Sequence, residues 1–366
     1  MKLECSRKDL LDALNLAATA SSVRTAMPIL QSIKLTAVDS GLTLLGCDSE
    51  MWAQRSILAN VEEPGAICVQ ASLIRDLVSK LPDGRVSFSL EGGNLMLRTA
   101  MSEWRMLALP AEDFPEIPPT EAKATIRLQM SEFRDAVDRV SYAVADDYTR
   151  PVLTGVLFNY DGTKLTLVAT DTHRLAVLNL DKPGIGSEVN AVVPEKALKA
   201  IKQLPIGDDE EIEVAFDETR LSVDVGQGKV VSQLLIGQYP NWRRVVPAET
   251  TRAWTLDRAE LVDNITRAMI LAKDNAYRIR FKGHGDQVLI SARSEEKGEA
   301  KEEVAVVGKN GDIEIAFNGK YVLDALSVMK CDGIKAEMTE ASFPAIFKPL
   351  EGEEGQFCVI MPMALG

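Results

Sequence analysis

The segment VATDTHRLAV, residues 168–177, carries three side chains that could do chemistry within four positions: Asp171, His173 and Arg174. His173 is one of only two histidines in the chain. An aspartate two residues before a histidine could form a general acid–base pair or supply two ligands to a metal ion. The pattern Asp-x-His is too common to identify either site alone, so a further catalytic or ligating group would have to come from elsewhere in the chain.

The chain lacks the short motifs that accompany such chemistry. It contains no nucleophile elbow G-x-S-x-G, no zinc-protease H-E-x-x-H, no P-loop and no G-x-G-x-x-G. Its five cysteines are scattered, and none forms a C-x-x-C pair, which is typical of buried reduced thiols rather than of disulfides or zinc sites. The sequence therefore predicts no catalytic residue, no metal and no cofactor.

A role in a turn explains Asp171 more simply. The strand expected over 165–169 must reverse into a strand over 174–180, and an aspartate at such a reversal accepts backbone N–H groups. Asp48 stands at the equivalent place of an earlier repeat, whereas the histidine does not repeat. We interpret Asp171 as a turn residue and keep an enzyme with Asp171 and His173 as an acid–base pair as an alternative.

Length and composition are those of a folded protein of two or three domains. The chain has 366 residues, 46% of them hydrophobic and 26% charged. No apolar run approaches the length of about 18 residues that spans a bilayer, and no signal sequence is visible, so we expect a cytoplasmic protein. The net charge of −13 argues against nucleic-acid binding over the whole surface but allows a local basic surface.

The sequence repeats with an offset of 123 residues. The segment MPIL at 27–30 aligns with RPVL at 150–153, and Asp48 aligns with Asp171. The same shift carries apolar and glycine positions of 156–169 onto 279–292. Agreement without gaps over such lengths predicts three copies of one domain.

Each copy is expected to have the same elements. An alternating strand leads into an amphipathic helix, at 8–20, 131–144 and 258–272, and a second helix follows at 72–81, 194–204 and 319–329. Hairpins with Asp-Gly-type turns supply the remaining strands. Proline-rich joins at 114–119 and 239–247 place the domains at 1–119, 120–247 and 248–366. The predicted fold class is α+β, three repeated domains with two helices packed on antiparallel sheets.

The exposed helix faces carry basic residues. Lys196, Lys199 and Lys202 form a ridge along the helix at 194–204, and seven acidic residues follow it within 206–218. Other basic residues on predicted helices are Arg7, Lys8, Arg134, Arg139, Arg258 and Arg267. A solvated helix face explains any one of these helices, but the pattern over all three copies favours a basic lining in an acidic body. Such a lining would bind phosphates without distinguishing bases.

The C-terminus is apolar. The segment GQFCVIMPMALG, 355–366, ends in a tail without a charged side chain. One interpretation is a last strand with a frayed end. The other is a flexible, methionine-rich lip beside an apolar groove that accepts varied short peptides.

Taken together, these features resemble the bacterial sliding clamp family, the beta subunits of DNA polymerase III. The resemblance covers the whole chain and rests on the triple repeat with ATDTHRLAV (169–177), YPNWRRVVP (239–247), FNGKYVLDAL (317–326) and the terminal VIMPM. It implies a non-catalytic protein whose head-to-tail dimeric ring surrounds double-stranded DNA, with helices lining the hole. The implied partners are DNA, a second copy, the DNA polymerase catalytic subunit, the clamp loader and other proteins with short clamp-binding motifs, and no membrane.

The resemblance also implies site residues. A pocket for partner peptides comprises Leu153, Thr170, Thr172, His173, Arg174, Leu175, Pro240, Arg244, Val245, Tyr277, Asn318, Tyr321, Met361, Pro362, Met363 and Leu365. Residues that face DNA are Arg24, Arg150, Lys196 and Arg278, to which the lysine ridge adds Lys199 and Lys202. At the dimer interface Trp104 and Met106 of one subunit pack on Ile270 and Leu271 of the other.

Three positions depart from the family pattern. Thr172 stands where we expect glycine, Ala364 where we expect a basic residue, and Ser72 replaces a basic residue that would face DNA. The first two could alter the preference for peptides. A monomeric three-repeat scaffold that binds proteins without encircling DNA stays as the second alternative.

Overall fold

The structure is a computed structural model and describes residues 1–22, 25, 27–309, 311–351 and 355–365. Its contacts group into two compact units. The first unit comprises Met1–Phe133, Ile185–Val189 and Val193–Leu234, and the second comprises Arg134–Gly184, Asn190–Val192 and Leu235–Gly366. The middle sequence repeat is divided between the units because its strands pair with strands of both neighbouring repeats.

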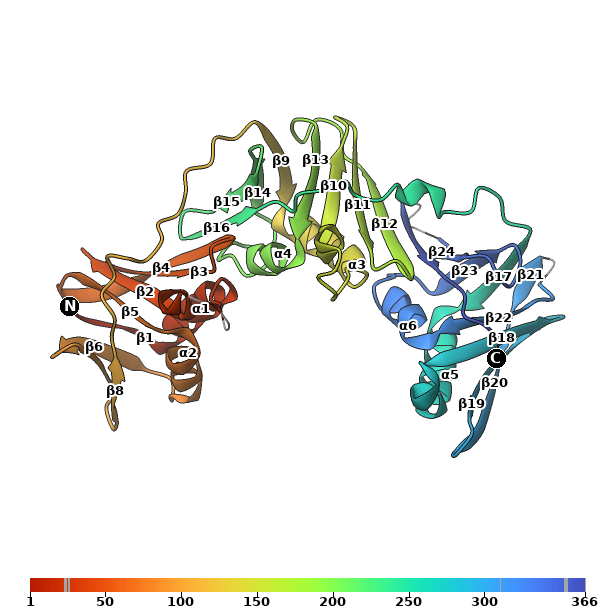
Figure 1. Ribbon diagram of the computed structural model, residues 1–366, viewed down its shortest axis with the longest axis horizontal. Helices are drawn as coiled ribbons and strands as arrows, with labels where there is room; N and C mark the ends of the chain where they lie inside the picture. Colours follow the sequence, from red (N-terminus) through yellow and green to blue (C-terminus); the bar gives the residue numbers. More distant parts are fainter. Residues whose placement is uncertain (23–24, 26, 310, 352–354, 366) are drawn as a thin grey trace. The chain divides into compact units, whose positions relative to one another are not determined.

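All three repeats contain the expected helices and strands (Figure 1). Residues 1–119 form β1 (Lys2–Ser6), α1 (Arg7–Thr19), the 3-10 helix η1 (Pro28–Gln31), β2 (Ser32–Val38), β3 (Gly41–Cys47), β4 (Met51–Glu63), β5 (Gly65–Gln70), α2 (Ala71–Lys80), β6 (Arg85–Glu91), β7 (Asn94–Arg98) and β8 (Glu103–Leu107). Residues 120–247 form β9 (Ala124–Gln129), α3 (Met130–Ser141), η2 (Pro151–Thr154), β10 (Gly155–Tyr160), β11 (Lys164–Thr170), β12 (Arg174–Asp181), β13 (Val189–Pro194), α4 (Glu195–Ile201), β14 (Glu211–Phe216), β15 (Arg220–Asp224), β16 (Gly228–Gln233) and η3 (Trp242–Arg244). The remainder forms β17 (Arg252–Asp257), α5 (Arg258–Ala272), η4 (Lys273–Asn275), β18 (Arg278–His284), β19 (Gln287–Ser294), β20 (Gly298–Ala305), β21 (Val307–Lys309), β22 (Glu314–Asn318), α6 (Gly319–Ser327), β23 (Gly333–Met338), β24 (Ala345–Pro349) and β25 (Gln356–Ile360).

The sheets are antiparallel, and the two larger ones cross the boundaries between repeats. In the first unit the strands follow the order β8-β7-β6-β1-β4-β16-β15-β14-β9, with β3 paired to β4 and β2 paired to both β3 and β5. A second sheet follows the order β13-β10-β11-β12-β25-β24-β23-β17-β21, and a third follows β20-β19-β18-β22. The pairings of β4 with β16 and of β12 with β25 thus extend a sheet from one repeat into the next.

Helices α1 and α5 each begin after a capping side chain, whereas α2 and α4 begin without one. The Ser6 hydroxyl accepts the backbone N–H of Asp9 at 3.4 Å, and the Asp257 carboxylate accepts the backbone N–H of Glu260 at 2.8 Å. α5 spans the predicted 258–272, whereas α3 and α4 each end three residues before the predicted end. The residues beyond α3 and α4 form turns with bonds from residue i to i−3, which close the helices more tightly than the 3.6-residue period suggests.

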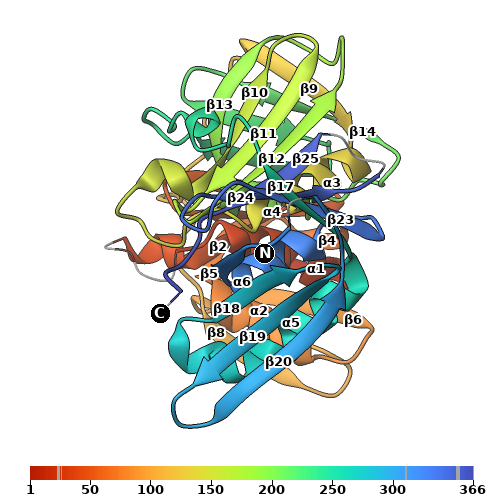
Figure 2. The ribbon, with the colours of Figure 1, turned by 90° about the vertical axis from the view of Figure 1, so that its right-hand side faces the viewer.

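The two helices of the first repeat lie side by side, as do the two of the third, and each pair packs on its sheets. α5 lies across one face of the sheet that contains β18, β19 and β20 (Figure 2). Arg7 on α1 donates to the carbonyls of Val78 (3.0 Å) and Ser79 (2.8 Å) at the end of α2. Arg258 on α5 donates to the carbonyl of Cys331 (2.8 Å), just after α6. These two arginines therefore join helices and satisfy carbonyl groups, and their assignment to a basic lining is wrong.

The core is divided into clusters. One lies within the first repeat and one within the third, where Leu14 and Ile265 are among the fully buried helix residues. Two smaller clusters, centred on Trp52 in the first unit and on Leu175 in the second, lie where one repeat is followed by the next. Within the described residues, no helix combines the length and hydropathy needed to cross a membrane.

Candidate functional site

The turn between β11 and β12 is built by Asp171. Its Oδ1 accepts the backbone N–H groups of His173 (2.9 Å) and Arg174 (3.0 Å). Asp48 does the same in the first repeat, where its Oδ1 accepts the N–H groups of Glu50 (3.1 Å) and Met51 (2.8 Å). The prediction that these aspartates shape turns is confirmed.

The other carboxylate oxygen of Asp171 pairs with the Arg174 guanidinium and not with His173. Oδ2 accepts the Nε of Arg174 at 2.9 Å, while the exposed His173 ring stacks on Tyr321 with 6.4 Å between ring centroids. No group of three or more His, Cys, Asp or Glu side chains among the described residues is arranged to hold a metal ion. The arrangement at Asp171 and His173 therefore stabilises a turn and offers no acid–base pair.

Arg174 lies in a nearly closed cage. Its side chain is 10% exposed, its Nη1 donates to Asp324 at 2.6 Å, and its guanidinium lies 4.5 Å from the ring centroid of Tyr321. The ring centroid of Tyr142 is 5.4 Å from the same guanidinium. Burial would lower the pKa of Arg174, but hydrogen bonds and charge from Asp324 and Asp171 outweigh it and raise the pKa. The guanidinium is bound in this way, but Arg174 also lines the pocket described next, so its role as a polar edge for a ligand stays a prediction.

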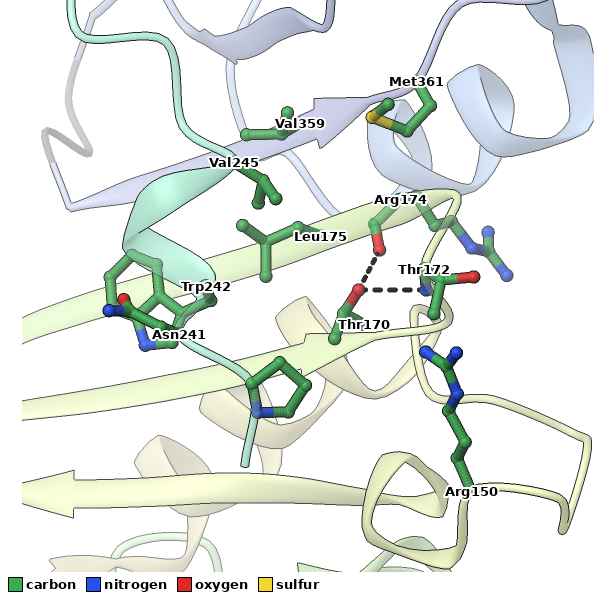
Figure 3. A pocket seen from close by; sticks show the side chains of 11 residues that line it. Arg150, Thr170, Thr172, Arg174, Leu175, Asn241, Trp242, Val245, Val359 and Met361 are labelled. Atoms are coloured by element: carbon green, nitrogen blue, oxygen red, sulfur yellow. Dashed lines mark hydrogen bonds between the residues drawn. The ribbon is translucent and has the colours of Figure 1, made fainter. Parts of the chain in front are cut away.

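Beside this turn is an apolar pocket of about 180 Å³. Thr170 and Leu175 contribute from β11 and β12, and Val359 contributes from β25 (Figure 3). Its remaining lining residues are Arg150, Thr172, Arg174, Pro240, Asn241, Trp242, Val245 and Met361. Thr170 Oγ1 donates to the Arg174 carbonyl at 2.7 Å and accepts the Thr172 N–H at 3.2 Å, which fixes one wall. The pocket can thus take an apolar side chain between a firm sheet and the segment that contains η3.

A second, more open cavity of about 640 Å³ adjoins the first. The two share Val245 and Met361, whose side chains are 46% and 39% exposed. Arg244 and the half-exposed Phe343 also line the second cavity. Exposed apolar side chains at the junction of two cavities are typical of a surface that binds another molecule.

Seven of the sixteen residues predicted for this pocket line the first cavity: Thr170, Thr172, Arg174, Leu175, Pro240, Val245 and Met361. An eighth, Arg244, lines the second cavity. Leu153 instead belongs to the buried core. Asn318 caps α6 through a bond from the Lys320 N–H (3.0 Å), and Tyr277 is 36% exposed at the start of β18. The sequence missed Asn241, Trp242 and Val359 as lining residues, although the first two stand within the motif YPNWRRVVP.

The C-terminal tail is tied down. The Met361 N–H donates to the His173 carbonyl at 2.9 Å, and the Met363 N–H donates to the Ala316 carbonyl at 2.7 Å. Arg280 donates to the carbonyl of Leu365. Pro362 lies between the two bonded methionines. Met361 lies beside the apolar pocket, as the interpretation of a methionine-rich lip expected, but backbone bonds hold the segment on both sides of Pro362.

The basic residues predicted to face DNA are only partly available. Lys196 and Lys199 are exposed on α4, but Lys196 pairs with Asp48 and Lys199 pairs with Glu195 at 2.8 Å. Lys202, just beyond α4, and Arg278, at the start of β18, are half-buried. Arg150 lines the first cavity, and Arg24 lies outside the described residues. The lysine ridge exists, but acidic side chains offset part of its charge.

The residues predicted for a dimer interface differ in exposure. Ile270 is 67% exposed on α5, while Leu271 is half-buried against the core of the third repeat. On the edge strand β8, Trp104 packs on the core and Met106 is 5% exposed. Side chains alternate along a strand, so Leu107 is the exposed one, at 71%. Met106 is therefore a core residue, and Leu107 takes its place on the exposed face.

Comparison with known proteins covers the full chain. Residues 1–118 match the family model of the N-terminal domain of the DNA polymerase III beta subunit. Residues 127–241 match the model of the central domain, and residues 243–364 match that of the C-terminal domain.

Individual relatives agree with these matches. The beta sliding clamp of Staphylococcus aureus is 30% identical over 374 residues, which cover 99% of each chain, and that of Synechocystis is 29% identical and covers all of both. The solved DNA polymerase III beta subunit of Thermotoga maritima superposes with a TM-score of 0.92 at 25% identity, with both chains fully covered. A sliding clamp of Pseudomonas aeruginosa bound to griselimycin has a TM-score of 0.90 at 29% identity, again over both full chains.

Proposed function

The chain belongs to the family of DNA polymerase III beta subunits, the beta sliding clamps, and on that basis we propose that two copies close head to tail into a ring around double-stranded DNA. As a DNA sliding clamp it is a non-catalytic subunit, so the alternative of an enzyme with Asp171 and His173 is wrong. The observation that carries the proposal is the match of all three repeats to clamp domains over the whole chain. A monomeric scaffold is the disfavoured alternative. The cytoplasmic location stays a prediction.

The pocket beside Leu175 is the proposed site for partner proteins. Its apolar lining, with Leu175 and Val359 at the base and Val245 and Met361 at the rim, fits a short peptide with apolar side chains. A solved relative that binds griselimycin supports a ligand site on this fold. The proposed partners are the polymerase catalytic subunit, the clamp loader and other proteins that carry clamp-binding motifs.

The lysines around α4 are the proposed contact to DNA. Lys196 and Lys199 are exposed on α4. Contacts between ammonium groups and phosphates bind DNA strongly when many act together, and they do not distinguish base sequence. Their pairing with Asp48 and Glu195 keeps each contact weak, which suits a protein that has to slide. Arg150, Arg278 and Lys202 remain proposed contributors.

The test changes charge without changing the fold. Replacing Lys196, Lys199 and Lys202 by glutamate should weaken binding of a duplex at least tenfold at low salt and should lower the salt dependence of that binding, because fewer counterions are released. The control replaces three exposed or half-buried strand lysines, Lys164, Lys229 and Lys348, which changes the net charge equally. If both triple variants bind duplex alike, α4 does not face the DNA.

The exposed edges β8 and β20 are the proposed dimer contact. β8 ends the order of the first sheet, with Leu107 exposed, and β20 ends the order of the third. Ile270 on α5, the helix that packs on β20, is exposed as well. A free strand edge carries unpaired backbone groups that a second chain can satisfy, and two different edges on one chain give a head-to-tail contact.

A further inference from the structure

The pocket beside Leu175 has a counterpart one repeat earlier in the chain. On the second unit β12 pairs with β25 so that Leu175 lies opposite Val359. On the first unit β4 pairs with β16 so that Trp52 lies opposite Val231. The offset of 123 residues carries Trp52 onto Leu175. Trp52 therefore occupies the position that forms the base of the pocket in the next repeat.

The backbone frame around the two positions is the same. The N–H of Gln233 donates to the Glu50 carbonyl at 2.8 Å, as the N–H of Met361 donates to the His173 carbonyl at 2.9 Å. The turns before the two strands are closed by Asp48 and by Asp171 in the manner described above. The same turn, the same strand pairing and the same bond after it show that the repeat builds this frame twice.

The space above the frame differs. In the second unit the cavity above Leu175 is open, and Val245 and Met361 at its rim are partly exposed. In the first unit Trp52 is 8% exposed and packs in a cluster with Leu30, Cys47, Cys68, Phe114 and Val231. Phe114 is the first residue of the proline-rich segment 114–119, as Tyr239 is the first residue of the proline-rich segment 239–247. An indole thus lies where the later repeat has an isobutyl side chain beside a cavity.

The indole is held without a bond to its nitrogen. Trp52 Nε1 is buried and has no hydrogen-bond partner among the described residues. A buried donor without a partner is unfavourable, so hydrogen bonding does not explain a tryptophan at this position. Its large apolar surface does, because the ring fills a space that a leucine would leave partly empty.

We propose that Trp52 fills the counterpart of the peptide pocket and closes it to partner peptides. The proposal rests on the proposed function of the pocket beside Leu175. The ligand that the opened counterpart would take is a small apolar ring, and indole, the ring that W52A removes, is the probe. The polar side chains Glu50 and Gln233 stand where the peptide pocket has His173 and Met361, so the opened site would not copy the peptide specificity.

The experiment opens the site in the full chain with W52A, and with W52L, which restores the side chain found in the later repeat. Cys47 lies in the same cluster as Trp52, and burial raises the pKa of its thiol. In both variants we expect maleimide to label Cys47 at least tenfold faster than in the wild type, and we expect saturating indole to reverse most of this gain. The control F347A removes a buried aromatic ring from the cluster of the third repeat and should leave Cys47 labelling unchanged.

Peptide stoichiometry provides the second measurement. By calorimetry the wild type should bind one clamp-binding peptide per chain. Two peptides per wild-type chain, or folded W52A and W52L proteins in which indole does not protect Cys47, would overturn the proposal. Wild type that binds no peptide, with Cys47 protected by indole in W52A, would instead overturn the proposed peptide function and leave the filled counterpart standing. If W52A does not fold, W52L alone decides the outcome.

Discussion

Removal of the tail after Ile360 tests the pocket most directly. Met361 lines both cavities, and the segment that follows it is held by the bonds of Met363 and Leu365. The stop has to come after Ile360, because Ile360 is fully buried and pairs with β12 and β24. A stop one residue earlier would remove a core side chain and cost about 2–5 kcal/mol of stability.

The expected loss follows from the share of the pocket that Met361 forms. Its side chain is 39% exposed in the free protein, so a bound peptide would cover apolar surface that water now reaches. Loss of one such anchor typically costs about 2 kcal/mol of binding free energy, which is roughly a thirtyfold rise in Kd. The truncated chain should keep the thermal unfolding of the wild type to within a few degrees, since Met361 and the tail lie outside the core clusters.

The assay is fluorescence anisotropy of a labelled peptide that ends in apolar residues. Wild type, the chain ending at Ile360 and the single variant Met361→Ala are titrated in parallel. Met101→Ala is the matched control, because this methionine is 94% exposed and belongs to the first unit. A Kd for the truncated chain within threefold of the wild type, with unfolding unchanged, would refute the assignment of the peptide to this pocket.

Three further predictions concern the interface, the cage and the thiols. Ile270→Glu should give folded monomers in light scattering, because it places a charge in the buried dimer contact. The control Leu58→Glu, at another strongly exposed apolar site, should leave the dimer intact. If both variants remain dimers, α5 is not at the interface. Asp324→Asn should raise the peptide Kd about tenfold, because Arg174 loses an ion pair that holds the pocket wall; calorimetry with an unchanged Kd would show that the wall is held without it. Burial raises the pKa of the Cys358 thiol to about 12, so at pH 8 the half-buried Cys331 should react first with a thiol reagent; a fast phase that survives Cys331→Ser would contradict this.

The departure at Thr172 illustrates what a sequence pattern can indicate without explaining. Glycine was the expected residue there from the family pattern alone. The structure gives the reason, because Thr172 has a φ of 77°, a left-handed conformation that costs an ordinary side chain about 1–2 kcal/mol. The chain accepts this strain in the turn that Asp171 closes beside the pocket.

The sequence by itself determined the repeats, the helices and the turns, because these depend on local spacing. A 3.6-residue apolar period identified α5 to the residue, and an aspartate at a reversal identified the turns at Asp48 and Asp171. The motif YPNWRRVVP also pointed to the pocket, although it did not distinguish Trp242 as a lining residue.

Only the tertiary structure decided which side chains are available. Arg174 pairs with Asp324, which is 150 positions away, and Lys196 pairs with Asp48, which is 148 positions away. Which of Met106 and Leu107 faces outward depends on the register of β8, and whether Trp52 lies above an open or a filled site depends on what packs over β4. A charge or an apolar surface is free to bind only if no distant part of the chain has already covered it, and spacing along the sequence carries no record of that contact.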